Sequence, residues 1–502
     1  MNNIVVINPG GRKLTYQELD NNLTAIEPPI WAGLITTYLQ LKNIKTRIID
    51  SNGLRINEEE TIQLALKENP KLIVIVAYGH NPSASTQTMP SSRLLLNQIN
   101  QSTYPGKTII VGGHPASLPK KTLLDENVDF VCTGEGPISI LELYSELEKK
   151  DNGLVYDFKA VRSLAFNDNG NIIRTAPAPL VKDLDNEMPT LPWDQLPMEN
   201  YLCHNWHAFG FQDRTHYASI YTTLGCPYQC HFCCIQAPFK DGESLINNEK
   251  EINTYRRWSP DSILKQIDHL VQTYQIKHIK IADELFVLNK NHVQDICEGL
   301  IERQYDLNIW AYSRIDTITQ ELAEFLYKAG IKWICLGIET TNLNSLSMVN
   351  KSTEKNTYKK SITYLKNNNI NIIGNFIFGL PDDDITSMTE TLNEAIDLEF
   401  DFVNFYSAMA YPGSKLYQQA IELEQPLPDT WNGFSQHSFD CLPLSTKHIS
   451  GKEVLRFRDQ AFHHFFESQK YLQYIEKKFG ENTKNHIINM AQKKLKRKYT
   501  NK

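Results

Sequence analysis

The 502-residue sequence lacks the features that mark secreted, membrane-spanning or nucleic-acid-binding proteins. It has neither a charged N-terminal stretch followed by an apolar one nor a run of about 18 apolar residues, so no signal peptide and no membrane span are expected. Acidic residues (58) outnumber basic ones (51), and a net charge of −7 disfavours binding to nucleic acid through a broad positive surface. The one basic run, "KKLKRK" (493–498), is interpreted as a solvated helix end. These observations predict a cytoplasmic protein without nucleic-acid or membrane partners.

Cysteine is also scarce, with nine residues in the chain, yet four of them lie in "GCPYQCHFCC" (225–234). Thiols stay reduced in the cytoplasm, so clustered cysteines there indicate a metal site or catalysis rather than a disulfide. The question is which metal such a loop would hold.

The first 150 residues alternate short apolar runs with helical patterns. The expected strands are 4–8, 46–50, 72–78, 108–113 and 130–135, and the expected helices are 30–43, 58–68, 91–101, 118–126 and one after Pro137. Asn57 and Glu60 have the spacing of a capping box. This alternation predicts a doubly wound α/β domain with a parallel sheet, whose ligands lie at the carboxyl ends of the strands. A G-x-G-x-x-G dinucleotide motif is absent after the first strand.

Residues 151–212 differ from the rest, because they contain Pro177, Pro179, Pro189, Pro192 and Pro197 and only short strand-forming segments. We interpret them as a linker that covers a surface.

Residues 213–420 continue the alternation of strands and helices. The expected strands are 217–223, 278–286, 308–316, 333–340, 371–380 and 402–409, with helices 259–274, 291–304, 319–329, 355–368 and 385–398 between them. Six repeats are fewer than the eight of a closed barrel, so we expect a partial, open parallel barrel. The cysteine loop follows the first strand and therefore lies at the end where barrel enzymes place their chemistry.

Cys226, Cys230 and Cys233 have C-x3-C-x2-C spacing. A structural zinc site needs four ligands, and Cys203 and Cys297 have no partner at C-x2-C spacing; His231 or Cys234 would make a cramped fourth ligand. Three thiolates on a [4Fe–4S] cluster would instead leave one iron open for a small molecule. Both metals remain possible from the residues alone.

The loop, with Phe232 beside Cys233, resembles the signature of the radical S-adenosylmethionine (SAM) enzymes. Further matches are "ADELF" (282–286), "YSRID" (312–316), "LGIETTN" (336–342), "GNFIFGLPDDD" (374–384) and "YPGSKLY" (411–417). The resemblance implies a [4Fe–4S] cluster on Cys226, Cys230 and Cys233, with Cys234 as a packed thiol. The residues that it implies for SAM are Phe232, Glu284, Arg314, Glu339 and Asn375, with Asp283 as an alternative to Glu284.

Residues 27–50, 109–137 and 191–197 resemble the cobalamin-binding domain and linker of B12-binding radical SAM enzymes. The residues implied for cobalamin are Asn8, His80, Gly112, Gly113, Gly134 and Glu135. Two departures stand out. The D-x-H-x-x-G loop, which supplies a histidine to cobalt in many B12 proteins, is replaced by "NPGGRK", and the usual G-G-P-H reads Gly112-Gly113-His114-Pro115, which leaves the role of His114 open.

Residues 421–502 are aromatic and partly helical, and we expect a helical cap on the barrel. If the stretch 431–445 closes the substrate cavity, Trp431, Gln436, His437 and Asp440 are candidate substrate contacts.

The resemblance implies an enzyme that cleaves SAM to a 5′-deoxyadenosyl radical, with cobalamin as methyl carrier, and that methylates an unactivated carbon of a small molecule. It also implies an electron donor such as flavodoxin or ferredoxin. Oxidative cyclisation or rearrangement without methyl transfer, a Rossmann-like domain that has lost cobalamin, and a non-catalytic metal-binding module are the alternatives.

Overall fold

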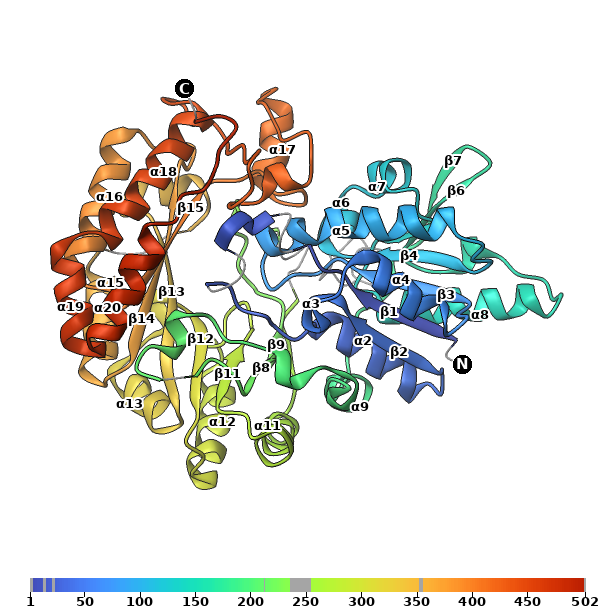
Figure 1. The fold of residues 1–502 in the computed structure, drawn as a ribbon, viewed down its shortest axis with the longest axis horizontal. Coiled ribbons are helices and arrows are strands. Elements are labelled where there is room, and N and C mark those ends of the chain that lie inside the picture. Colours follow the sequence, from blue (N-terminus) through green and yellow to red (C-terminus); the bar gives the residue numbers. More distant parts are fainter. Residues whose placement is uncertain are drawn as a thin grey trace.

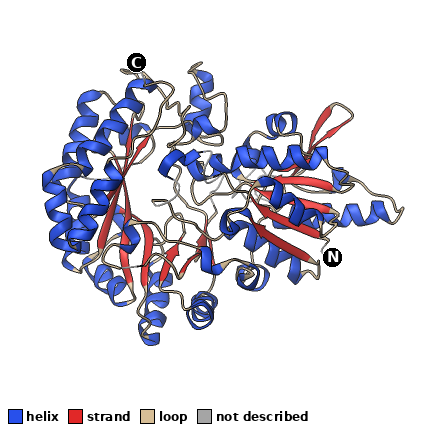
Figure 2. Ribbon diagram, viewed as in Figure 1, coloured by secondary structure: helices blue, strands red, loops and turns tan. Residues whose placement is uncertain are grey.

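The computed structural model describes residues 3–11, 15–19, 23–211, 213–234, 254–351 and 355–500. Two lobes lie side by side, each built on a sheet with helices packed against it (Figures 1 and 2). The N-terminal lobe contains β1 to β7, and the second lobe contains the strands from β8 onward together with the C-terminal helices.

The N-terminal sheet has the strand order β2-β1-β3-β4-β5-β6-β7, and its first five strands are parallel. These are β1 (Ile4–Asn8), β2 (Thr46–Asp50), β3 (Leu72–Val76), β4 (Lys107–Val111) and β5 (Phe130–Cys132). All five residues of β1 and of β3 are buried, which agrees with a parallel sheet covered on both faces. The predicted doubly wound α/β fold is confirmed.

The helices of this lobe are α2 (Ile30–Leu41), α3 (Ser51–Leu54), α4 (Glu58–Leu66), α5 (Pro82–Gln101), α6 (Gly113–Ser117), α7 (Pro119–Asp125) and α8 (Pro137–Asp151). Asn57 and Glu60 form the predicted capping box of α4. Helix α5 begins nine residues earlier than expected, because Asn81 caps it and it continues through Pro90. The expected helix 118–126 corresponds to α7, and α6 precedes it.

The proline-containing stretch 151–212 contributes a hairpin to the N-terminal sheet. Strands β6 (Leu164–Asp168) and β7 (Asn171–Arg174) pair antiparallel, and β6 pairs antiparallel with β5. The stretch also contains α9 (Leu184–Glu187) and several single turns of 3-10 helix. The division of the chain at residues 150, 212 and 420 stays a prediction.

The second sheet has the order β15-β14-β13-β12-β11-β8, with every neighbouring pair parallel. Its strands are β8 (Tyr217–Ile220), β11 (His278–Ile281), β12 (Asn308–Arg314), β13 (Ile331–Glu339), β14 (Asn371–Phe378) and β15 (Phe402–Ser407). The edge strands β8 and β15 do not pair with each other, so the predicted open, six-stranded partial barrel is confirmed.

The barrel helices are α11 (Pro260–Tyr274), α12 (Lys290–Arg303), α13 (Gln320–Lys328), α14 (Leu343–Met348), α15 (Lys355–Asn367) and α16 (Ile385–Asp397). Side chains of Ser259, Asn289, Thr319, Asn342 and Asp384 cap five of them. A short pair of strands, β9 (Thr223–Leu224) and β10 (Arg256–Arg257), flanks the cysteine loop.

The C-terminal part is helical, as expected, with α17 (Lys415–Glu422), α18 (Gly451–Phe466), α19 (Gln469–Phe479) and α20 (Glu481–Ala491). Phe465 and Phe466 of α18 are buried and lie against Phe405 and Phe402 of β15, respectively. The cap therefore closes one edge of the barrel. In the described part of the chain, no helix is long and apolar enough to cross a membrane.

Candidate functional site

Two cavities lie where the lobes meet. The larger, of about 610 Å³, is lined by barrel residues such as Trp310 and Tyr406, by N-terminal residues such as Gln87, and by the C-terminal part. The smaller, of about 110 Å³, lies beyond the carboxyl ends of β1 and β3. The two cavities share the lining residues Tyr16, Ala25, Glu27, Ala84 and Gln87. A ligand at the edge of the N-terminal sheet would therefore lie next to one inside the barrel.

The cysteine loop follows β8 and β9, as predicted. Gly225 begins it with φ +90°, and a Cβ at this position would lie 2.0 Å from the carbonyl oxygen of Thr254, so only glycine fits. The backbone N–H of His231 donates to the Val349 carbonyl at 3.0 Å, and the N–H of Leu416 donates to the His231 carbonyl at 3.0 Å. These bonds fasten the loop to α14 and to α17.

Cys226, Cys230 and Cys233 are half-buried thiols that form no disulfide, and the N–H of Cys233 donates to the Cys230 carbonyl at 3.0 Å. Burial raises the pKa of Cys226 to about 11 and also raises that of Cys230. Such thiols stay protonated at neutral pH until a metal displaces the proton. Cys234 is fully buried and burial raises its pKa to about 12, as expected for a packed thiol.

Two cations lie close to this loop. The Arg314 guanidinium stacks on the Tyr228 ring at 4.0 Å, and its Nε and Nη2 donate to the two carboxylate oxygens of Asp316. Lys351 Nζ donates to Glu339 Oε1 at 2.6 Å, and this buried pair lies near enough to Cys230 to influence its titration. Positive charge at this position favours thiolates, and so favours binding of a metal.

The two acidic residues at the end of β11 have different surroundings. Asp283 is buried and accepts hydrogen bonds from the backbone and hydroxyl of Thr222 and from the hydroxyl of Thr223, so it fixes the start of the loop. Glu284 accepts from the N–H of Gly225 through Oε2, while its buried Oε1 has no partner among the described residues. Burial raises the pKa of Glu284 to about 8. Of the two residues, Glu284 is the one with an oxygen left for a ligand.

Other residues predicted for SAM lie on neighbouring strands. Glu339 ends β13 with φ +67°, in the left-handed region that a non-glycine residue adopts rarely, and a register irregularity precedes it. Asn375 of β14 donates to Cys335 Sγ at 3.0 Å and accepts from Asn404 at 2.9 Å. Phe232 packs against apolar clusters that include Val349 and Leu416. The structure thus brings Glu284, Arg314 and Glu339 around the loop, whereas Asn375 faces the barrel interior; their contacts with SAM stay a prediction.

Only two of the residues predicted for cobalamin line the smaller cavity, namely Asn8 and His80. Asn8 donates to Asp50 Oδ1 at 2.7 Å, and His80 Nε2 lies 3.2 Å from the Pro28 carbonyl. One polar atom in the lining, the Tyr78 hydroxyl, is buried without a hydrogen-bond partner among the described residues, and His80 Nδ1 has only Glu27 Oε2 near it, at 3.5 Å. Unpartnered buried polar atoms are costly, which fits a site that a ligand completes.

The other predicted cobalamin residues lie outside the described lining of both cavities. Gly112 and Gly113 lead into α6, and a Cβ on Gly112 would lie 2.6 Å from the Ala77 carbonyl oxygen. A Cβ on Gly134 would lie 2.7 Å from Ser163 Oγ. Glu135 is buried in an ion pair with Arg256 and accepts from the N–H of Val181 at 3.1 Å. Their role toward cobalamin stays a prediction.

His114, whose role the sequence leaves open, is buried at the contact with the C-terminal part. Its ring lies 6.2 Å from that of Tyr411 and 6.1 Å from that of Trp431, and its Nδ1 lies 3.2 Å from the Pro412 carbonyl.

Among the candidate substrate contacts of 431–445, only His437 lines the large cavity. Gln436 exchanges hydrogen bonds with the backbone of Ser407, and Trp431 donates to Glu126.

A buried charge network between the lobes was not predicted. Glu27 Oε1 accepts from Lys280 Nζ of β11 and from the Tyr217 hydroxyl of β8, both at 2.8 Å, and Oε2 lies 3.5 Å from His80 Nδ1. Although burial favours the neutral acid, His80 and Lys280 hold the pKa of Glu27 well below its usual range. The available signal was Lys280, a charged residue within the apolar strand "HIKI".

This network predicts a fall in stability on the acidic side of neutrality. Burial lowers the pKa of His80 from 6.5 to about 4, and that of His204, whose Nε2 lies 3.8 Å from Glu27 Oε1, to about 3. Below about pH 6.5 the unfolded chain binds protons at these histidines while the native chain does not, so the free energy of unfolding decreases as the pH falls toward 4, by up to about 1.4 kcal/mol per pH unit for each histidine. Urea unfolding at pH 7.5 and pH 5 measures this, and His80→Gln should weaken the dependence. An unchanged pH dependence in that variant would argue against the assignment.

Three thiols outside any disulfide lie on one loop beside Arg314 and Lys351, which fits a three-cysteine iron–sulfur cluster, and the Glu284 oxygen without a hydrogen-bond partner among the described residues fits a ligand next to it. The Tyr78 hydroxyl, which has no hydrogen-bond partner among the described residues, lines the smaller cavity and fits a cofactor at the edge of the N-terminal sheet.

Two protein-family models match this chain, one over the barrel that carries the cysteine loop and one over the N-terminal lobe. Residues 220–395 match the family model of the radical SAM superfamily, and residues 19–143 match that of the B12 binding domain. An uncharacterised methyltransferase of Pyrococcus horikoshii is 24% identical over 447 residues, which are 89% of each chain. An anaerobic magnesium-protoporphyrin IX monomethyl ester cyclase of Rubrivivax gelatinosus is 23% identical, over 89% of this chain and 75% of the relative.

Two solved structures share the fold. The radical SAM methyltransferase TsrM of Kitasatospora setae, with cobalamin and a [4Fe–4S] cluster bound, has a TM-score of 0.65 at 14% identity. The match covers 92% of this chain and 88% of the TsrM chain. The cobalamin-dependent radical SAM enzyme OxsB, with aqua-cobalamin and SAM bound, has a TM-score of 0.69 at 16% identity. The match covers 98% of this chain and 72% of the OxsB chain.

Proposed function

Because the chain belongs to the radical SAM enzymes that carry a B12-binding domain, we propose that it methylates an unactivated carbon of a small-molecule substrate. Its cofactors are a [4Fe–4S] cluster, SAM and cobalamin. The observation that carries the proposal is the shared lining of the two cavities, which places the edge of the N-terminal sheet next to the barrel interior.

Each group of residues has a distinct part in this proposal. Cys226, Cys230 and Cys233 hold the cluster, and Glu284 offers a carboxyl oxygen to the amino or ribose groups of SAM. Lys351 and Arg314, each paired with a carboxylate, place a cationic group near the thiols. Asn8 and His80 line the smaller cavity, to which we assign the cobalamin. When bound, the cofactors supply the radical and the methyl group, and the protein supplies position and exclusion of water.

The test is anaerobic purification after supplementation with iron, sulfide and cobalamin, followed by metal analysis and an assay of 5′-deoxyadenosine release with dithionite and SAM. We expect about four iron ions and one cobalt per chain, together with SAM cleavage. Iron and cleavage without cobalt would refute methyl transfer from cobalamin and favour a Rossmann-like domain without cofactor. A single zinc ion without cleavage would refute the proposal as a whole.

A second candidate is oxidative cyclisation or rearrangement with the same cofactors, since a cyclase is among the relatives that align over most of the chain. Product analysis with methyl-labelled SAM separates the two, because only methylation transfers the label to a product. An electron donor such as flavodoxin or ferredoxin completes the proposal, since the cluster must be reduced before each SAM cleavage.

A further inference from the structure

The basic run 493–498 forms part of the wall of the large cavity. Helix α20 ends at Ala491, so the run does not continue that helix, and the interpretation as a solvated helix end is wrong. Lys493, Lys494, Leu495 and Arg497 all line the cavity, and the Arg497 side chain is only 1% exposed. This stretch is therefore part of the site.

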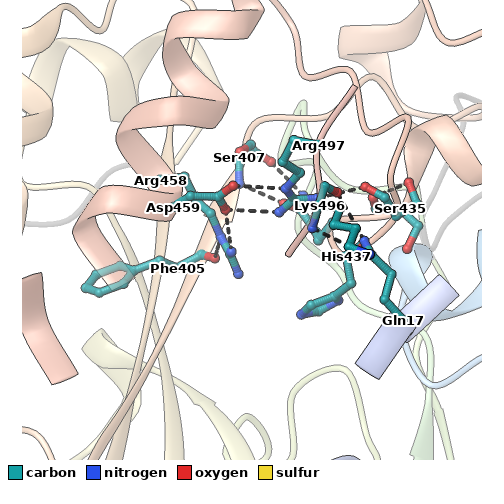
Figure 3. Close-up of polar contacts among 11 residues, drawn as sticks. Gln17, Phe405, Ser407, Ser435, His437, Arg458, Asp459, Lys496 and Arg497 are labelled. Atoms are coloured by element: carbon teal, nitrogen blue, oxygen red, sulfur yellow. Dashed lines mark hydrogen bonds and ion pairs between the residues drawn. The ribbon is translucent and has the colours of Figure 1, made fainter. Parts of the chain in front are cut away.

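Specific hydrogen bonds hold the run in place (Figure 3). Arg497 donates to both carboxylate oxygens of Asp459, at 2.9 and 3.0 Å, and to the Ser438 carbonyl at 2.9 Å. Gln17 accepts from the N–H of Lys496 at 3.1 Å and donates to the Lys496 carbonyl at 3.2 Å and to the His437 carbonyl at 2.9 Å. The run is thus tied to the N-terminal segment, to α18 and to the loop after α17, so its charges have a fixed position.

Positive charge exceeds negative charge around this cavity, although the whole chain carries −7. Among the described lining residues, the only anions are Glu27 and Asp459, whereas the cations are Lys280, Arg456, Arg458, Lys493, Lys494 and Arg497. Lys280 pairs with Glu27, and Arg458 and Arg497 share the single carboxylate of Asp459.

Three further cations form no ion pair with a described residue. Arg456, Lys493 and Lys494 form no ion pair or side-chain hydrogen bond with any described residue, although the charge of Arg456 helps to lower the pKa of Glu453, one turn earlier on α18. Arg456 and Lys494 are exposed and Lys493 is partly exposed, so these charges lie toward the open side of the cavity. The interior is different, since aromatic side chains line it, among them Trp206, Trp310, Tyr312, Phe402, Phe405 and Tyr406. One cavity therefore combines a positive mouth with an aromatic interior.

We propose that the substrate is an amphipathic small molecule whose phosphate or carboxylate group is bound by Arg456, Lys493 and Lys494 while its apolar body lies in the barrel. This inference rests on the proposed function, because it assigns the large cavity to the substrate. A cavity of about 610 Å³ is within the range of small-molecule sites. The bound anion would neutralise charges that the protein leaves unpaired, and the aromatic walls would contact the apolar part.

The test measures anion binding to the cofactor-loaded, full-length protein by calorimetry at low salt. The probes are pyrophosphate, citrate and uncharged maltose, which distinguish a phosphate site from a carboxylate site. We expect saturable binding of at least one anion and none of maltose, with an affinity that decreases as salt is added. Lys493→Gln/Lys494→Gln should weaken this affinity about tenfold, since two solvent-facing ion pairs are lost.

The matched control is Lys360→Gln/Lys477→Gln, which removes the same charge from exposed lysines of α15 and α19 that do not line the cavity. It should leave the affinity within about twofold. No saturable anion binding by the unmodified protein, or an equal loss in both double variants, would overturn the inference. Because the readout is binding without turnover, failure of SAM cleavage would refute the proposed function and leave this result unaffected.

Discussion

Replacing Cys226, Cys230 or Cys233 by serine is expected to lower SAM cleavage by at least about 10³-fold, equivalent to about 4 kcal/mol of activation free energy. Each thiol belongs to one short loop held between the end of β9 and α14, and the one other described cysteine in that loop, Cys234, is buried. A missing thiolate leaves the cluster one ligand short, and the site then loses the group that delivers the electron. The measurements are iron content, visible absorbance and 5′-deoxyadenosine release.

The matched control is Cys234→Ser, which alters the cysteine next to the triad. Cys234 is buried and burial raises its pKa to about 12, so it is expected to keep iron and activity, with at most a loss of stability. Circular dichroism of each variant separates loss of the cluster from loss of the fold. If any one of the three serine variants retained normal iron content and cleavage, that residue would not be a cluster ligand.

Lys280→Met is expected to lower the free energy of unfolding by about 3–5 kcal/mol, because it leaves the buried Glu27 carboxylate without its cation. Lys280 Nζ donates to Glu27 at 2.8 Å, is 2% exposed, and lies 4.9 Å from the centre of the Trp310 ring. Methionine keeps the length of the side chain, so the loss reflects charge rather than volume. Urea unfolding followed by tryptophan fluorescence measures the effect.

Two further variants make this result specific. Glu27→Gln/Lys280→Met should recover part of the loss, since no uncompensated charge remains. Lys332→Met removes an ion pair with Asp306, whose side chain is 93% exposed, and should cost less than about 1 kcal/mol. Equal losses in Lys280→Met and Lys332→Met would show that the buried network does not join the lobes.

The strands could be predicted because buried parallel strands are continuous runs of Val, Ile and Leu, which differ from the 3.6-residue hydrophobic periodicity of the helices between them. The segments 4–8 and 46–50 match β1 and β2 residue for residue. Helix α5 was predicted too short, since Pro90 reads as a break but lies within the helix. The hairpin of β6 and β7 was not predicted, because its two short strands are stabilised by the pairing of β6 with β5, which the local sequence does not indicate.

Some residues of the candidate site could likewise be predicted from the sequence, and others could not. The three cysteines could be identified because all the ligands lie within eight residues, so their spacing alone constrains the geometry. Glu284 and Asp283 could not be told apart, because adjacent residues differ only in what packs around them. Glu135 carries the motif of a ligand site, yet its surroundings place it in an ion pair with Arg256.

The sequence by itself determined the two sheets, the loop of three thiols and the order of the domains, since each depends on patterns among residues close together in the chain. The tertiary structure alone decided that Glu27 meets Lys280, 253 residues away, and that Gln17 holds Lys496, 479 residues away. Contacts between residues so far apart in the chain produce no periodicity or motif spacing in the sequence from which they could be predicted. They exist because burial of both lobes against each other brings polar groups together, and each buried group then requires a partner.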